Sequence, residues 1–311
     1  MIMMINKWMF NRSCISTNTF CLAFAMAICT PLTANGFDEN TTVVYVNGEV
    51  ITMTSAQPGA VATIAAAGKG ARTVDLDGSA ILPGFIDAHG HFSLTAMYEA
   101  FANFAASDKP VGPQTYSDED VLTVVVQARK HGLKVATHAH GAEGIMASVK
   151  AGAASIEDGS ILTEKIVKEM KARGTFLVPT TPVMNQSALK DPNLPSKGVE
   201  VIEKAIQNHR LAIKSGVKIA YGTDAGLYSH GKNADGFLDL IDYGMSPAQA
   251  IKTATVNAAE LLGVDDRGVI AVGKLAYIIA VDGNQLEDVS LLKDVSFVMK
   301  NGKIYKLAAQ H

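Results

Sequence analysis

The chain has 311 residues, of which 48% are hydrophobic and 18% are charged, and its formal net charge is −3. This length accommodates one large domain, or one domain with a smaller companion, and the apolar content is sufficient for a substantial core. The slightly acidic balance excludes the basic surface that nucleic-acid binding requires, so we expect no nucleic-acid partner.

Residues 1–34 have the layout of a secretory signal peptide. Lys7 and Arg12 precede the apolar run FCLAFAMAICTPL (20–32), and small residues follow it. A run of this length is typical of a cleaved leader and is short for a membrane span. We expect cleavage after Ala34, a secreted or periplasmic protein, and no membrane association once the leader is removed. An uncleaved N-terminal anchor is the alternative.

All three cysteines of the chain lie inside this leader, at positions 14, 21 and 29. The bulky Ile28 argues against lipid modification of Cys29. The mature chain would therefore contain no thiol, and any metal ion would be held by His, Asp or Glu side chains.

Both ends of the remaining chain carry β-hairpin signals. TTVVYVNGEVITM (41–53) and VSFVMKNGKIYKL (295–307) each predict two strands around Asn-Gly, and further β-rich segments lie next to them. We expect a small β-sandwich domain assembled from residues 35–82 and 265–311, with a second domain, residues 83–264, inserted between them.

The inserted domain alternates strands and helices. Strands are predicted at 133–141, 153–160, 175–180 and 217–226, and a long helix at 198–215. Ser117 and Asp120 form the capping-box pattern of the helix that ends at Lys130. This alternation is typical of parallel strands, in an open sheet or a barrel.

Two histidine pairs stand where strands are expected to end. SAILPGFIDAHGHF (79–92) predicts a buried strand ending in His89 and His91, whose side chains would point to the same face. His138 and His140 repeat this spacing at the end of a second strand. Converging imidazoles are typical of a metal site, and a solvated loop is the alternative for a single pair.

Several motifs together resemble the amidohydrolase superfamily, in particular its imidazolonepropionase-like and Xaa-Pro dipeptidase-like branch. They are LPGFIDAHGHF, VATHAHG, SIEDGS, YGTDAG and SPAQAIKTATVNAAELLGV followed by RGVIAVGKLA, and they cover nearly the whole mature chain. The resemblance implies an α/β fold: a metal-dependent (β/α)8 barrel of the TIM type, with a β-sandwich formed by both termini.

The resemblance also implies roles for individual residues. His89, His91 and His138 correspond to metal ligands, and Asp224 corresponds to an aspartate that binds metal and acts as the general base. His140 and His230 correspond to groups that face the substrate. From the residues alone, Asp224 could instead be a helix N-cap, and His140 a structural histidine.

The chain departs from the family pattern at two places. Asp158 stands where the family has histidine; because a carboxylate can bind zinc, Asp158 completes the predicted ligand set. Only about 40 residues separate His91 from the strand of His138, where the family places three strands and a bridging lysine. We therefore expect an incomplete barrel of about five strands and one zinc ion in preference to two, with another divalent metal as the alternative.

These features predict an exported metal-dependent amidohydrolase that cleaves the C–N bond of a small amide, dipeptide or cyclic amide. A zinc-activated water would attack, with Asp224 as general base. One alternative is a truncated, non-catalytic remnant with a weak or absent metal site. Another is the same metal chemistry applied to a lactone or phosphotriester. A homo-oligomer in which a second subunit covers the gap in the barrel is a further alternative.

Overall fold

The computed structural model describes residues 2–5, 43–46, 49–53, 60–61, 72–75, 78–90, 114–185, 187–192, 196–228 and 230–307. The predicted cleavage site, the cysteines of the leader and His91 lie outside the described residues.

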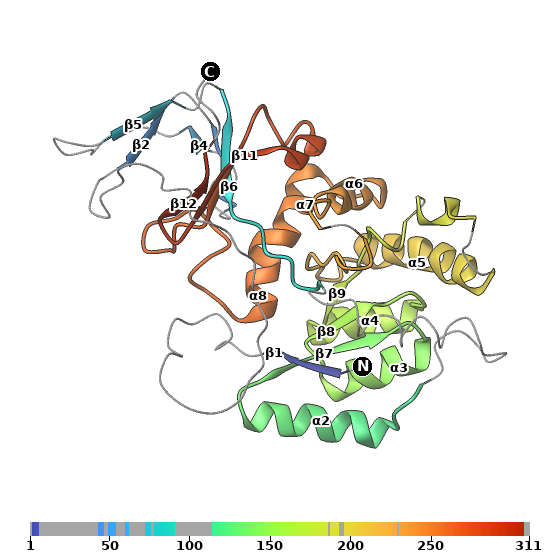
Figure 1. The fold of residues 1–311 in the computed structure, drawn as a ribbon. Helices are drawn as coiled ribbons and strands as arrows, with labels where there is room; N and C mark the ends of the chain where they lie inside the picture. Colours follow the sequence, from blue (N-terminus) through green and yellow to red (C-terminus); the bar gives the residue numbers. More distant parts are fainter. Residues whose placement is uncertain are drawn as a thin grey trace.

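Strands and helices alternate in the middle of the chain and strands dominate its ends (Figure 1). The strands are β1 Ile2–Ile5, β2 Val43–Val46, β3 Glu49–Val50, β4 Ala60–Val61, β5 Arg72–Asp75, β6 Ala80–Pro83, β7 Lys134–Ala139, β8 Ser155–Asp158, β9 Phe176–Val178, β10 Ile278–Val281, β11 Val295–Lys300 and β12 Lys303–Lys306. The α-helices are α2 Asp118–Lys130, α3 Ala142–Ala151, α4 Glu164–Arg173, α5 Ser196–Ser215, α6 Asp235–Asp242, α7 Pro247–Lys252 and α8 Ala258–Leu262. Two 3-10 helices, η2 Ala188–Lys190 and η4 Val289–Lys293, and the π-helix η3 Thr253–Asn257 complete the described elements.

A six-stranded sheet combines strands from both ends of the chain, in the order β12-β11-β10-β6-β3-β4 (Figure 1). The predicted C-terminal hairpin is confirmed: β11 and β12 pair antiparallel around Asn301 and Gly302, whose φ angles of 52° and 78° are those of a type I′ turn. Strands from both ends share this sheet, as expected, and the limits of a separate β-sandwich domain stay a prediction.

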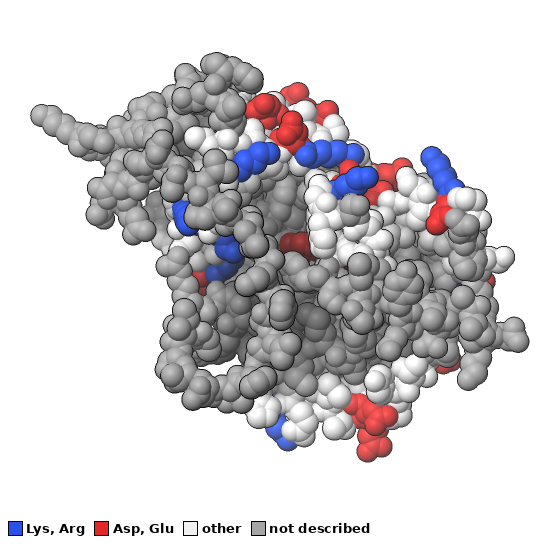
Figure 2. All heavy atoms as spheres, viewed as in Figure 1, with Lys and Arg blue, Asp and Glu red and all other residues white. Residues whose placement is uncertain are grey.

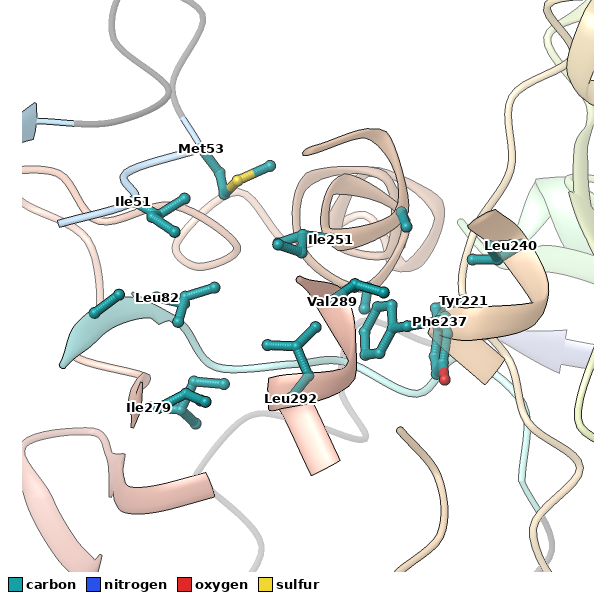
Figure 3. Packing of buried hydrophobic residues seen from close by; sticks show 14 residues of the cluster. Ile51, Met53, Leu82, Tyr221, Phe237, Leu240, Ile251, Ile279, Val289 and Leu292 are labelled. Carbon is teal, nitrogen blue, oxygen red and sulfur yellow. The ribbon is translucent and has the colours of Figure 1, made fainter. Parts of the chain in front are cut away.

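The predicted N-terminal hairpin is wrong. Strand β2 pairs with β5, whereas β3 lies parallel to β6 and antiparallel to β4. The residues that follow β3 explain this pairing, because Ile51 and Met53 are buried in one cluster with Leu82 of β6 (Figure 3). Burial against a distant strand outweighs the local turn signal.

A second sheet has the order β1-β7-β8-β9. Strands β7, β8 and β9 are parallel, as the strand–helix alternation predicts, and β1 runs antiparallel along β7. Within the described residues this sheet does not close on itself, so the expected incomplete barrel is confirmed.

The predicted strand at 217–226 forms only single parallel bridges, Leu177 with Ile219 and Gly90 with Ala225. Its backbone follows β9 for a short distance, since the Ala220 N–H donates to the Leu177 carbonyl over 3.0 Å. Beyond that point the Tyr221 N–H donates to the Thr253 carbonyl instead, over 3.0 Å. The hydrogen bonds of this segment are therefore divided between β9 and η3, and no continuous ladder forms.

Two large apolar clusters support the sheets. The first contains Leu82, Tyr221, Phe237 and Ile251 and joins the six-stranded sheet to helices α6 and α7 (Figure 3). The second lies between the four-stranded sheet and helices α3, α4 and α5. Because both clusters receive residues from the segment near 217–221, this segment links the two sheets.

The helix predictions are confirmed. The Ser117 hydroxyl accepts from the Asp120 N–H over 3.2 Å, and the Asp120 carboxylate accepts from the Ser117 N–H over 3.0 Å, which is the expected capping box of α2. Helix α5 spans Ser196–Ser215, close to the predicted 198–215.

On the surface shown in Figure 2, basic and acidic side chains alternate over the described part of the face. None of the described helices combines the length and the apolar character that a membrane span needs.

Candidate functional site

The loop that carries His89 is fixed by residues from the other half of the chain. Strand β6 ends at Pro83, and His89 lies six residues beyond this end. The sequence predicted His89 at the end of the strand, and that prediction is wrong. The Ile86 N–H donates to the Ala254 carbonyl over 2.7 Å, and the Ala88 N–H to the Tyr221 carbonyl over 2.8 Å. Residues 84–90 are thereby held by long-range hydrogen bonds in place of a strand ladder.

Asp87 locks this loop onto the segment that contains Asp224. Its carboxylate accepts from the Thr223 N–H over 3.1 Å, from the His89 N–H over 3.2 Å and from the Asn233 amide over 2.9 Å. The His89 carbonyl in turn accepts from the Thr223 and Asp224 N–H groups over 2.9 and 3.0 Å. These contacts bring His89 and Asp224 together, although 135 positions separate them.

His89, His138 and Asp224 meet at one place, as the sequence predicted. The His89 Nε2 lies 3.1 Å from an Asp224 carboxylate oxygen and 3.1 Å from the His138 Nε2. His138 lies in β7 and projects from the carboxyl end of this strand. His89 and Asp224 are buried, and His138 is partly buried.

Each of the two imidazoles has a carboxylate at its other nitrogen. The His89 Nδ1 lies 3.3 Å from Glu157, and the His138 Nδ1 lies 2.7 Å from Asp158. Burial alone would lower the pKa of His89, but the hydrogen bonds to Asp224 and Glu157 outweigh it and raise this pKa to about 10. A carboxylate at Nδ1 fixes the ring and directs Nε2 toward the shared position, as outer carboxylates do for metal-bound histidines.

Asp158 uses both carboxylate oxygens within the protein. One oxygen contacts the His138 Nδ1 and lies 3.3 Å from the His140 Nε2, and the other accepts from the Thr180 hydroxyl over 2.8 Å. Burial by itself would raise the pKa of Asp158, but the adjacent His140 and His138 hold it well below its usual range. Asp158 therefore bridges the two histidines of the pair as an anion.

The backbone of Asp158 is in the left-handed region, with φ of 67°, and His209 holds it there. The His209 Nε2 donates to the Asp158 carbonyl over 2.6 Å, and burial lowers the pKa of His209 to about 4, so the ring is neutral. His209 lies on the long helix predicted at 198–215, where the sequence showed no sign of a role, but its side chain is completely buried.

The remaining predicted residues occupy different surroundings. The His140 Nδ1 lies 2.8 Å from the Ser160 hydroxyl, and burial lowers the pKa of His140. His230 is exposed on the loop that follows Asp224. The structure thus groups His89, His138, His140, Asp158 and Asp224.

Two members of the group were absent from the predicted set. Glu157 and His209 both contact it, and only Glu157 left a signal in the sequence, as a carboxylate at the end of a predicted strand. His209 left none, because its partner is a backbone carbonyl 51 positions away.

The chemistry of the donor set fits a zinc ion. The His89 Nε2 faces both the His138 Nε2 and an Asp224 carboxylate oxygen, and each ring has a carboxylate at its Nδ1. In the part of the chain that the structure describes, no three His, Asp or Glu side chains are already arranged to hold an ion. The predicted ligand His91 lies outside that part.

Comparisons with known proteins place this geometry in context. The model of the amidohydrolase family matches residues 99–305. Ochratoxinase of Aspergillus niger is 32% identical over 203 residues, which are 61% of this chain and 42% of the relative. The imidazolonepropionase of Deinococcus deserti is 26% identical over 183 residues, 57% of this chain and 42% of that protein. The chain thus spans less than half the length of these relatives.

Solved structures share the fold. A Xaa-Pro dipeptidase with methionine bound in its active site superposes with a TM-score of 0.72 and 25% identity, covering 85% of this chain and 99% of that one. The A. niger ochratoxinase structure gives a TM-score of 0.60 and 31% identity, covering 66% of this chain and 49% of that one.

Proposed function

Because the chain belongs to the amidohydrolase family, we propose that it is an exported, metal-dependent hydrolase that cleaves a C–N bond in a small molecule. The substrate class is an acylated amino acid, a dipeptide or a cyclic amide. The convergence of His89, His138 and Asp224 is the observation that carries this proposal. The names of the relatives, an ochratoxinase and a Xaa-Pro dipeptidase, support the same class of substrate.

In this proposal His89, His138 and Asp224 would hold one zinc ion, together with His91. Bound zinc supplies a Lewis acid that polarises a carbonyl and lowers the pKa of water. Asp224 accepts the proton of the attacking water and returns it to the leaving amine. The fixed backbone of the Asp224 segment, hydrogen-bonded to the His89 carbonyl, supports this role because it positions the carboxylate beside the His89 imidazole.

We assign Asp158 and Glu157 to the orientation of the imidazoles. Both oxygens of Asp158 are engaged by protein groups, and this favours a positioning role over the ligand role expected from the family pattern. Glu157 has the same relation to His89 through Nδ1. His140, beside Asp158, and His230, on the exposed loop that follows Asp224, remain the proposed groups for contact with the substrate.

Metal analysis and one variant test the hydrolase. Purified protein is expected to retain zinc, and its hydrolysis of an N-acyl amino acid, a Xaa-Pro dipeptide or a cyclic amide is expected to fall about 10²- to 10⁴-fold in Asp224→Asn. Asp265→Asn, at an exposed carboxylate, is the matched control and should leave the rate unchanged. Hydrolysis that is equal in both variants would refute the role of Asp224.

A non-catalytic remnant is the competing function, and the open sheet and the short coverage of the relatives favour it. The two functions differ in their response to zinc. A real site stabilises the folded state by about 2.7 kcal/mol at a zinc concentration 100 times its Kd. A melting temperature that zinc does not change, together with no turnover on the three substrates, would establish the remnant.

A further inference from the structure

We propose that Asn233 is a positioning residue of the candidate site. It holds the segment that follows Asp224 and carries His230 against the Asp87 carboxylate, and it thereby raises the affinity for substrate. The inference rests on the proposed hydrolase, in which His230 contacts the substrate. Asn233 does not belong to the set of site residues predicted from the sequence.

The side chain of Asn233 makes hydrogen bonds in two directions. Its amide nitrogen donates to an Asp87 carboxylate oxygen over 2.9 Å and lies 3.3 Å from the Thr223 hydroxyl. Its amide oxygen accepts from the Gly231 N–H over 3.1 Å. The two polar groups of this side chain therefore join the later part of the segment to the Asp87 carboxylate.

These contacts differ from those of a helix cap. An asparagine directly before a helix commonly accepts a hydrogen bond from an N–H of the first turn. Helix α6 begins at Asp235, its N-cap position is Ala234, and this end of α6 has no side-chain cap hydrogen bond. The Asn233 oxygen binds Gly231, which precedes the helix. The geometry therefore favours a role in holding the segment over a role in capping α6.

Asp87 anchors both ends of the segment. One carboxylate oxygen accepts from the His89 and Thr223 N–H groups over 3.2 and 3.1 Å, and the other accepts from the Asn233 amide. Thr223 directly precedes Asp224, so the segment starts and ends on the same carboxylate. Loss of the Asn233 amide would release the later end, whereas the hydrogen bonds that place Asp224 would remain.

The backbone of Asn233 has a separate support in the core. The Tyr221 hydroxyl donates to the Asn233 carbonyl. The Tyr221 ring stacks on Phe237 of α6, with ring centroids 4.4 Å apart and an interplanar angle of 20° (Figure 3). Both rings are buried. Truncation of the Asn233 side chain should therefore leave the start of α6 in place and affect the residues before it.

The first test separates KM from kcat. With a substrate that the wild type hydrolyses, Asn233→Ala should raise KM about tenfold, keep kcat within about twofold and leave the zinc content unchanged, because the lost contact affects binding and not the chemical step. Asn284→Ala is the matched control. It removes the same kind of amide, which contacts Glu287 over 3.2 Å, and should leave both constants unchanged. A lower kcat at constant KM in Asn233→Ala would overturn the proposal.

The second test exchanges donor and acceptor. Asn233→Asp alone sets two carboxylates opposite each other and should raise KM further than Asn233→Ala. Asp87→Asn combined with Asn233→Asp again pairs one amide with one carboxylate, and the new amide oxygen at position 87 can still accept from the His89 and Thr223 N–H groups. The double variant should therefore have a KM at least about threefold below that of Asn233→Asp. A double variant with a KM no lower than that of Asn233→Asp would contradict the proposed pairing.

The third test does not depend on hydrolysis. Lys232 is exposed and directly precedes Asn233, so trypsin cleavage after Lys232, identified by mass spectrometry, reports how firmly the segment is held. Asn233→Ala should accelerate this cleavage about tenfold, and Asn284→Ala should not change it. Equal cleavage in Asn233→Ala and wild type would overturn the inference. A wild type without zinc-dependent hydrolysis would refute the proposed function, whereas the trypsin rates would still decide whether Asn233 holds the segment.

Discussion

Asp239 is expected to make the protein less stable as the pH rises from about 4 to 6. The carboxylate lies on α6 and accepts a hydrogen bond from Asn185 over 3.0 Å. Burial, together with the nearby Asp235 and Asp242, raises the pKa of Asp239 from 3.8 to about 6. Between these values the folded protein keeps a proton that the unfolded chain releases, so the free energy of unfolding falls with increasing pH.

The size of this effect follows from the shift. About two pKa units correspond to about 3 kcal/mol, and partial exposure of the carboxylate reduces the expected effect to about 2 kcal/mol. Asp239→Asn removes the charge and keeps the shape. The variant is expected to match the wild type at pH 4 and to exceed its free energy of unfolding by about 2 kcal/mol at pH 7.5.

Urea unfolding of both proteins at pH 4, 5, 6 and 7.5 measures this difference. Asp265→Asn, which removes an exposed carboxylate, is the control variant. A difference between Asp239→Asn and wild type that is constant over the four pH values would refute the reasoning. So would a variant that is less stable at pH 7.5, since it would mean that the hydrogen bond from Asn185 outweighs the cost of the buried charge.

Three further predictions concern the site and the core. His209→Phe leaves the Asp158 carbonyl buried without its donor and should lower the free energy of unfolding by about 2 kcal/mol, whereas the exposed His131→Phe should change it by less than about 0.5 kcal/mol. Glu157→Gln should weaken zinc binding about 10- to 100-fold in competition with a coloured chelator, and an unchanged affinity would remove Glu157 from the site. Ile251→Ala, at a fully buried position, should lower the free energy of unfolding by about 2–5 kcal/mol in urea, and a loss below about 1 kcal/mol would mean that the cluster around it collapses to fill the space.

The parts of the fold that depend on local signals follow from the sequence. Residues within a few positions determine the capping box at Ser117, the turn at Asn301–Gly302 and the strands of His138 and Asp158. For the same reason the grouping of polar residues at the carboxyl ends of β7 and β8 could be predicted, because parallel neighbouring strands bring their ends together.

The parts that depend on distant partners could not be predicted. The helical periodicity of α5 does not identify His209 as a buried residue. Its ring donates a hydrogen bond to the Asp158 carbonyl, which lies 51 positions away in the sequence. The loop of His89 reads as a continuation of β6, although that strand joins a different sheet. In both cases the deciding contacts span many tens of residues, and no local pattern records them.

These distant contacts also explain how the site persists beside an open sheet. The loop of His89 is held by hydrogen bonds from its own N–H groups to the carbonyls of Tyr221 and Ala254. The Asp87 carboxylate also accepts a hydrogen bond from the Thr223 N–H. All of them join residues 84–90 to residues 221–254. None of these hydrogen bonds comes from the barrel strands that the family pattern places between His89 and β7. A chain with a shortened barrel can therefore keep His89 and Asp224 in place. His138 is positioned separately, by strand β7, which pairs with β1 on one side and with β8 on the other.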